Sequence, residues 1–257
     1  MARRKQRLLG SHQKCWLWGR HVVTETLRAG KWIPLELHLS DSLPDDERTA
    51  ARVFARASQI PVHIDSPETL RKLCRSEDHQ GYVAKMPEFP YADAGKLCEE
   101  RAERPLFVLL DGVQDPFNFG AIVRSADVFG VDAVFLKQAG QVGVTSLAAR
   151  ASAGAVNFVP IARTDDLAAL ARRLRGCGVS VVGMHPGSKD SLHQIDFRGP
   201  SAVIIGNEAA GLSEELRQCC DRETRIPQHG RVDSLNAAVA AGVVLYEAAR
   251  QRERIEN

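Results

Sequence analysis

The sequence lacks several features that would assign it to a common protein class. No apolar run approaches the roughly 20 residues that cross a bilayer, and the basic N-terminus has no apolar core of a secretory signal. The six cysteines show no C-x-x-C spacing and no adjoining histidine cluster, so no metal site is expected. Reduced thiols are typical of the cytoplasm, which we predict as the location.

A strong overall charge is also missing. The 257 residues contain 34 Lys and Arg against 32 Asp and Glu, and a net charge of +2 does not by itself indicate a nucleic-acid partner. The distribution is more informative, because six basic residues precede the first acidic residue, Glu25. Such an arm suits RNA phosphates or simply aids solubility, and composition leaves both interpretations open. The arm consists of Arg3, Arg4, Lys5, Arg7, Lys14 and Arg20.

What the sequence does have is a regular alternation of strand and helix patterns. This predicts an α/β protein with a mainly parallel sheet and helices on both of its faces. We expect a small α/β domain with the basic arm in residues 1–86, a linker in 87–104 and a larger domain in 105–257. In the larger domain, "NFVPI" (157–161) is predicted as a strand, and the following helix is capped by Thr164 or Asp165.

The last helix is predicted from about Ser234 to Arg250. One of its faces is apolar and includes small residues, which permits close helix packing. The residues of this face are Leu235, Ala238, Val239, Gly242, Val243 and Tyr246.

Three strand ends of the larger domain run into loops rich in glycine, asparagine and acidic residues. They are "DPFNFGAIVRSA" (115–126), "IIGNEAAGLSEEL" (204–216) and "RIPQHGRVDSLNAA" (225–238). Taken singly, each has a structural interpretation, with Asn118 or Ser234 as helix caps. Because the carboxyl ends of parallel strands meet at one sheet edge, the three together predict a small-ligand site. A nicotinamide-dependent dehydrogenase is disfavoured, since no G-x-G-x-x-G follows the first of these strands.

In this order and spacing, the three loops resemble the signature motifs of the SpoU (TrmH-like) family of RNA ribose 2′-O-methyltransferases, within the SPOUT superfamily. "NFGAIVRSA" resembles the first motif, "IGNEAAGL" the second and "IPQHGRVDSLN" the third. "GRHVVTETLRAG" and "HQGYVAK" near the N-terminus resemble the family's small RNA-binding domain, so nearly the whole chain is covered. The likeness is greatest to enzymes that methylate a guanosine of large-subunit (23S) ribosomal RNA. A tRNA substrate and a non-catalytic RNA-binding protein on the same fold are the alternatives.

The resemblance implies a C-terminal trefoil knot, a homodimer formed through the C-terminal helices, and S-adenosylmethionine as the cofactor. It also implies a catalytic set of Arg124, Asn118, Glu208 and Asn236. The family assigns the role of base to this arginine, yet a guanidinium stays protonated. We therefore expect Arg124 to bind the adjacent phosphate and stabilise the developing alkoxide, while the phosphate or Glu208 accepts the proton. The cofactor-binding residues that we expect are Gly206, Asn207, Gly211, Ile226, Ser234 and Leu235.

Three residues depart from the motifs of the family. Ala209 stands where the second motif usually has a glycine, Gln228 stands where the third usually has methionine, and Met184 follows a strand where small residues are common. An alanine is unfavourable only where the backbone needs a positive φ. All three departures are expected to touch the cofactor pocket.

Overall fold

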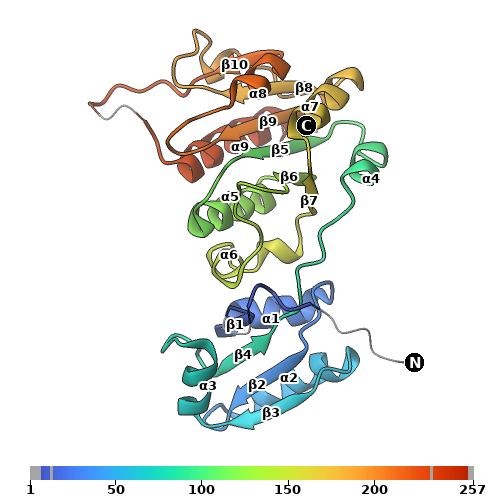
Figure 1. The fold of residues 1–257 in the computed structure, drawn as a ribbon, viewed down its shortest axis with the longest axis vertical. Helices are drawn as coiled ribbons and strands as arrows, with labels where there is room; N and C mark the ends of the chain where they lie inside the picture. Colours follow the sequence, from blue (N-terminus) through green and yellow to red (C-terminus); the bar gives the residue numbers. More distant parts are fainter. Residues whose placement is uncertain (1–6, 12–13, 232–233, 254–257) are drawn as a thin grey trace. The chain divides into compact units, whose positions relative to one another are not determined.

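The computed structural model describes residues 7–11, 14–231 and 234–253, and these residues form two compact units (Figure 1). The N-terminal unit comprises the chain up to Pro90 together with Val144–Phe158, and the C-terminal unit comprises Tyr91–Gly143 and the chain from Val159 onward. Residues 144–158 thus pack with the N-terminal unit, although the sequence pattern places them within the larger domain. Arg3, Arg4 and Lys5 of the basic arm lie outside the described residues.

The N-terminal unit is built on a four-stranded sheet with the order β1-β4-β2-β3. Its β1 and β2 each pair antiparallel with β4, and β2 pairs parallel with β3. The strands are β1 (Trp16–Trp18), β2 (Glu36–Ser40), β3 (Val62–Asp65) and β4 (Tyr82–Lys85). The helices are α1 (Arg20–Ala29), α2 (Asp45–Ala57), α3 (Pro67–Cys74) and α6 (Ser146–Ala151), with a 3₁₀ turn η1 (Ala155–Asn157).

Local sequence signals explain where the helices of this unit begin and end. Ser66 caps α3 by accepting a hydrogen bond from Thr69 N–H, and Pro67 occupies the first helical position. The left-handed backbone of Gly30 ends α1. Tertiary contacts fix the inserted segment, since the Arg150 guanidinium of α6 lies 4.6 Å from the Trp18 ring centroid. Asn157 also donates to Thr26 Oγ1 of α1.

The C-terminal unit contains a six-stranded, fully parallel sheet with the order β10-β8-β9-β5-β6-β7. Its strands are β5 (Leu106–Asp111), β6 (Ala133–Lys137), β7 (Ile161–Thr164), β8 (Ser180–Met184), β9 (Ser201–Gly206) and β10 (Arg222–Thr224). Its helices are α4 (Ala94–Glu99), α5 (Pro116–Val128), α7 (Leu167–Gly176), α8 (Glu214–Cys219) and α9 (Ala237–Glu253), with a 3₁₀ turn η2 (Leu192–Gln194). The predicted α/β class and the parallel sheet are confirmed.

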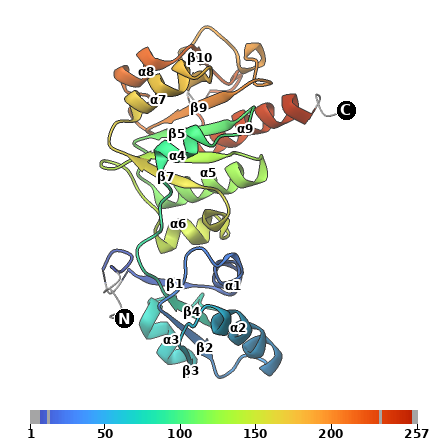
Figure 2. The same cartoon turned by 90° about the vertical axis from the view of Figure 1, so that its right-hand side faces the viewer.

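Helices cover both faces of this sheet (Figure 2). On one face, α4, α7 and α8 pack against alternate residues of the strands, with Phe107 and Phe135 at the centre of the core. On the other face α5 lies against α9. Gly242 of α9 faces Ser125 of α5, since a Cβ added at Gly242 would lie 3.6 Å from Ser125 Oγ, an ordinary contact distance. Along the described chain, no helix is both long and apolar enough to cross a membrane.

Several predicted element boundaries are wrong. Residues 155–157 form a 3₁₀ turn and the strand begins only at Ile161, because Pro160 lacks an N–H for a ladder. Asp166, rather than Thr164 or Asp165, caps α7. Asn236, rather than Ser234, caps α9 by accepting hydrogen bonds from Ala238 N–H and Val239 N–H.

Candidate active site

The second and third motif loops line a cleft beside the carboxyl ends of β8, β9 and β10, and the first loop contacts its wall through a hydrogen bond from Asn118 to Glu208. The cleft has a volume of about 480 Å³, within the range of small-molecule sites. Adjacent strands β9 and β5 lead to helices on opposite faces of the sheet, α8 and α5, which opens a crevice where ligands bind in parallel sheets. All six expected cofactor residues line the cleft: Gly206, Asn207, Gly211, Ile226, Ser234 and Leu235.

The second motif loop is held in shape by its own backbone. Asn207 and Gly211 exchange two N–H···O=C hydrogen bonds of 2.9 Å, and Gly211 adopts a φ of 69° that favours glycine. Gly206 permits the turn to close, because a Cβ there would lie 2.4 Å from the carbonyl carbon of Gly211. Ala209 is not among the residues with a positive φ, so its replacement of the usual glycine introduces no backbone strain.

The Asn207 side chain forms its hydrogen bonds with the backbone of the protein. Its Oδ1 accepts from Ala209 N–H and Ala210 N–H, and its Nδ2 donates to Gly112 O at 2.6 Å. Gly112 follows β5, so Asn207 ties the second motif loop to the start of the first. Asn207 lies where the sequence places it, but its polar atoms are already used by the protein.

A buried carboxylate, Asp111, anchors the other end of the same loop. It ends β5 opposite Gly206 of β9, accepts Ser213 N–H at 2.8 Å, and pairs with Lys137 of β6. Burial alone would raise the pKa of Asp111, but the hydrogen bonds from Lys137 and Ser213 outweigh it and lower the pKa below its ordinary value. The sequence analysis missed Asp111 and Lys137, although an acidic residue that ends a buried central strand was a usable signal.

Three of the four expected catalytic residues form one chain of side-chain hydrogen bonds. Asn236 Nδ2 donates to Asn118 Oδ1 at 2.9 Å, and Asn118 Nδ2 donates to Glu208 Oε1 at 2.9 Å. Asn118 is free to do so because Asp115, not Asn118, caps α5. The chain therefore joins the three motif loops, and its Glu208 end lies on the wall of the cleft.

Arg124 is placed differently from the other three. It lies on α5 with its side chain exposed, and it forms no hydrogen bond or ion pair with any residue that the structure describes. Helical spacing puts it on the same face as two exposed residues, Phe117 two turns before it and Val128 one turn after it. The guanidinium is thus available to a ligand or to another chain.

The segment that follows β8 contributes a residue that the sequence analysis did not select. His185 lines the cleft, and its backbone N–H donates to Thr224 O. Its Nδ1 is buried without a hydrogen-bond partner among the described residues, and the nearest carboxylate oxygen, Glu223 Oε2, is 4.0 Å away. Met184 and Gln228, the two other departures from the motifs, also line the cleft.

The described cleft suits a nucleoside cofactor. Ile226, Leu235 and Leu212 provide apolar surfaces, and the close turn at Gly206 brings backbone polar groups to the same wall. Ligand sites of this kind combine an apolar lining with a few polar groups that fix orientation. A parallel sheet with such a cleft at its strand ends defines a class of proteins that bind a small ligand there, and comparison with known proteins identifies the family.

The profile of the SpoU rRNA methylase family matches residues 105–246, and that of the RNA 2′-O ribose methyltransferase substrate-binding domain matches residues 16–92. The chain therefore belongs to the SpoU family of RNA methyltransferases. It is 31% identical over 248 residues to the putative TrmH family tRNA/rRNA methyltransferase YacO of Bacillus subtilis, covering 95% of this chain and 99% of that protein. It is 34% identical over 238 residues to the 23S rRNA (guanosine-2′-O-)-methyltransferase RlmB of Shewanella oneidensis, covering 92% and 97% of the two chains.

Solved structures agree with this assignment. The SpoU methyltransferase AviRb from Streptomyces viridochromogenes, in complex with the cofactor AdoMet, superposes with a TM-score of 0.78. The two chains are 28% identical, and the match covers 97% of this chain and 96% of that one. S-adenosylmethionine is accordingly the cofactor of the family, as the motifs predicted.

Proposed function

We propose that this protein methylates the ribose 2′-OH of a guanosine in large-subunit ribosomal RNA. The observation that supports the proposal is the chain of hydrogen bonds through Asn236, Asn118 and Glu208, which joins the first motif loop to the cleft lined by the second and third. The similarity to a 23S rRNA guanosine methyltransferase over 97% of that protein's length favours ribosomal RNA. A tRNA substrate is the second candidate, because the similar YacO is described as a tRNA/rRNA methyltransferase.

In this proposal the second and third motif loops hold the cofactor. Backbone groups of Gly206, Ile226 and Leu235 read the adenine edge, and the aliphatic side chains cover its faces. Asn207 and Gly211 maintain the conformation of the second motif loop, and Ser234 of the third motif loop lines the same cleft. Bound S-adenosylmethionine supplies a methyl group that its sulfonium already activates.

The protein must then align the ribose and stabilise its poorly acidic hydroxyl as it becomes an alkoxide. We assign the positive charge to Arg124, which stays protonated and can also bind the neighbouring phosphate. In this proposal the phosphate or Glu208, which accepts a hydrogen bond from Asn118, takes up the 2′-OH proton. Asn236 orients Asn118, so a single hydrogen-bonded chain sets the position of Glu208.

We further propose that the protein acts as a homodimer through α5 and α9. The predicted apolar face of α9 is not the one that the C-terminal unit buries, since the buried residues are Ala241, Val244, Leu245 and Ala248. Val239, Val243 and Tyr246 remain exposed, and α5 adds exposed Phe117 and Val128. Because Arg124 shares the exposed face of α5, such a dimer would place it at the interface. The trefoil knot implied by the resemblance remains a prediction.

RNA binding is assigned in this proposal to the N-terminal unit and its basic arm, because the profile of the substrate-binding domain matches residues 16–92. The boundaries 1–86, 87–104 and 105–257 remain the proposed division into RNA-binding domain, linker and methyltransferase domain. We also propose a cytoplasmic location, in keeping with cysteines that form no disulfide among the described residues.

Two measurements test the function. Calorimetry of the full chain with S-adenosylmethionine should show binding without RNA, and a folded protein that binds none at millimolar cofactor would contradict the cofactor assignment. Mapping of ribose methylation in total RNA from a deletion strain should show one guanosine of the large-subunit RNA unmethylated. Loss of a tRNA methyl group instead would support the second candidate, and an unchanged methylation map would indicate a non-catalytic RNA-binding protein.

A further inference from the structure

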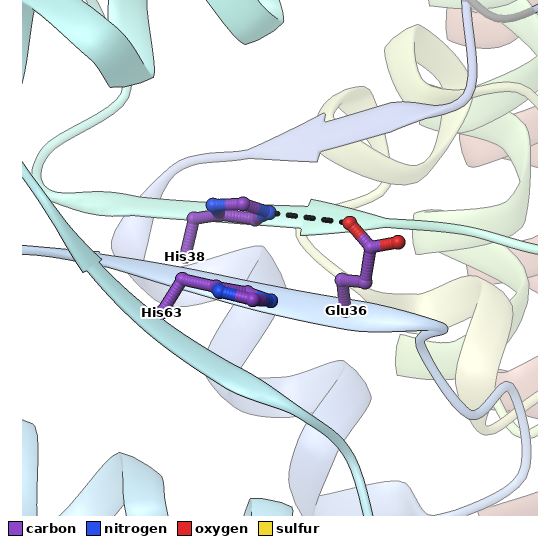
Figure 3. A group of neighbouring side chains, drawn as sticks. All are labelled: Glu36, His38 and His63. Carbon is purple, nitrogen blue, oxygen red and sulfur yellow. Dashed lines mark hydrogen bonds and ion pairs between the residues drawn. The ribbon is translucent and has the colours of Figure 1, made fainter.

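A group of metal-ligating side chains lies in the N-terminal unit, outside the candidate active site. Glu36 and His38 alternate on β2, so both point to the same face of the sheet. His63 of the parallel neighbour β3 is paired in register with His38 and shares that face. Figure 3 shows the two imidazole rings lying one over the other, with the Glu36 carboxylate at their outer end.

The three side chains bring suitable atoms together. One ligand atom from each of Glu36, His38 and His63 lies within 4.8 Å of the others. The ring centroids of His38 and His63 are 4.7 Å apart, and His38 Nε2 lies 3.5 Å from Glu36 Oε2. Ligands of a tetrahedral ion at about 2.0–2.1 Å are roughly 3.3 Å apart, so a modest rotation closes the set. Exposed His63 is free to make that rotation.

A second carboxylate fixes the orientation of His38. His38 Nδ1 lies 2.8 Å from Asp65 Oδ2. The rings of His38 and Trp16 pack in a T-shaped arrangement, with their centroids 5.5 Å apart. A histidine that donates its other ring N–H to a carboxylate is the usual arrangement behind a metal ligand. The other ring nitrogen, Nε2, faces Glu36 Oε2, so a cation between these two atoms would have one nitrogen and one oxygen ligand.

Charged side chains surround the three proposed ligands. Lys85 Nζ contacts the other carboxylate oxygen of Glu36, Oε1, at 3.0 Å and leaves Oε2 toward the histidines. Asp65 adds a second negative charge, so the two carboxylates and one ammonium leave the group net negative around the imidazoles.

We propose that Glu36, His38 and His63 bind one Zn²⁺ ion, with Asp65 as the hydrogen-bonded support of His38 and water in the fourth position. Two imidazole nitrogens and one carboxylate oxygen are ligands that suit Zn²⁺, whereas Mg²⁺ prefers a shell of oxygens. The ion ties the edge strand β3 to β2 and so strengthens the sheet of the N-terminal unit. The site uses no cysteine, which is why the search for cysteine spacings did not find it.

The test is calorimetric titration of Zn²⁺ into the reduced, EDTA-treated full chain. One ion per chain should bind with a Kd in the micromolar range or tighter, and His63→Gln and Glu36→Gln should each weaken binding at least tenfold. Asp65→Asn should weaken it about 10- to 100-fold, as expected for a support residue. His21→Gln is the matched control, because His21 is an exposed histidine of the same unit outside the group, and it should bind as the unaltered chain does. No binding up to 100 µM Zn²⁺, or equal affinity in His63→Gln, overturns the proposal.

Two further measurements do not depend on the affinities of the variants. Zn²⁺ should raise the melting temperature of the unaltered chain by about 3 °C or more but leave that of His63→Gln unchanged. Substitution with Co²⁺ should give the visible bands of nitrogen and oxygen ligands. Thiolate charge-transfer bands would instead assign the ion to the cysteines and refute the site.

Discussion

The position of Arg124 indicates that its role in the proposed reaction is separate from that of the other three expected catalytic residues. The hydrogen-bonded chain of Asn236, Asn118 and Glu208 needs no contribution from it, and no described residue neutralises its charge. A guanidinium in this state is a poor base and a good phosphate ligand. The residue is therefore expected to act on the charge of the transition state and not on the cofactor.

Arg124→Ala should lower kcat about 10²- to 10³-fold while the affinity for S-adenosylmethionine is retained, because one preorganised donor is lost. Single-turnover methylation of the native RNA, with calorimetry of the cofactor, measures both quantities. Arg124→Lys keeps the charge but loses the planar fork, so it should restore little of the rate. Full activity of Arg124→Ala would refute the role.

The route of the proton has its own test at this scale. With a carboxylate such as Glu208 or a phosphate as acceptor, the rate should level off well below pH 9. A rate that still climbs near pH 10 in folded protein would identify the arginine itself as the base. Glu208→Gln separates the two acceptors, since only a phosphate acceptor would leave its rate unchanged.

Gly206 and Ala209 lie in one loop but differ in what they tolerate. Gly206→Ala should weaken cofactor binding at least tenfold and destabilise the fold by about 1–3 kcal/mol, because the added Cβ would lie 2.4 Å from a backbone carbon of Gly211. Ala209→Gly restores the usual motif residue, yet it should change the cofactor affinity by less than twofold, since Ala209 has no positive φ to relieve. Calorimetry and thermal unfolding of the two variants provide the comparison, and equal effects would contradict this account of the loop.

At the scale of the element, the contacts between the ends of β5 and β9 fix the position of the second motif loop. Asp111 holds the loop through Ser213 N–H, and Asn207 holds it through Gly112 O. These two contacts come from adjacent strand ends and make the loop a continuation of the sheet. The cofactor cleft is thus predicted to lose its shape when these contacts are weakened, without any change in the lining residues.

The contacts of the Asp111 carboxylate predict that the stability of the fold depends on pH. The pKa of Asp111 is lowered in the folded chain, so its stabilising contribution is present above the unfolded value near 4 and is lost as the pH falls through the folded value. Unfolding in urea between pH 6 and pH 3 should therefore show a stability that falls with acid more steeply in the unaltered chain than in Asp111→Asn. Asp115→Asn is the control, because Asp115 also lies near this strand end but is not paired with Lys137. Parallel curves for the unaltered chain and Asp111→Asn would contradict the prediction.

At the scale of the whole molecule, the exposed apolar residues of α5 and α9 are the feature that a monomer does not explain. Val239, Tyr246, Phe117 and Val128 are each more than half exposed, and together they follow two helices that pack on each other. Contiguous exposed apolar surface of this kind marks an interaction site. A second copy of the chain presents the same surface, as a two-fold interface requires.

Light scattering at micromolar concentration should give a mass near twice the 28.2 kDa of one chain. Val239→Glu should shift the mass toward that of one chain, because a buried glutamate without a partner opposes association. Val53→Glu is the matched control, since Val53 is also an exposed valine and lies on α2 of the N-terminal unit. The exposed fraction is 63% for Val53 and 53% for Val239. A monomer mass for the unaltered chain would refute the dimer, and dissociation by Val53→Glu would place the interface elsewhere.

The sequence by itself determined the local features of this protein. The helix caps at Ser66 and Gly30, the apolar strands and the six residues expected to bind the cofactor follow from short-range patterns and motif spacing. The caps of α7 and α9 differ from the prediction, because Asp166 and Asn236 compete with similar candidate caps one or two residues away. Propensity distinguishes such neighbours by only a fraction of a kcal/mol.

Only the tertiary structure decided which distant residues meet. Asn118 lies 90 residues from Glu208 and 118 from Asn236, and Ser213 lies 102 residues from Asp111, yet each pair is in hydrogen-bond contact. Likewise, His38 meets His63 because β2 and β3 pair in parallel, and residues 144–158 join the N-terminal unit through contacts with Trp18 and Thr26. The physical reason is that side-chain periodicity is a property of one element, whereas the order β10-β8-β9-β5-β6-β7 is chosen by burial of all the elements together.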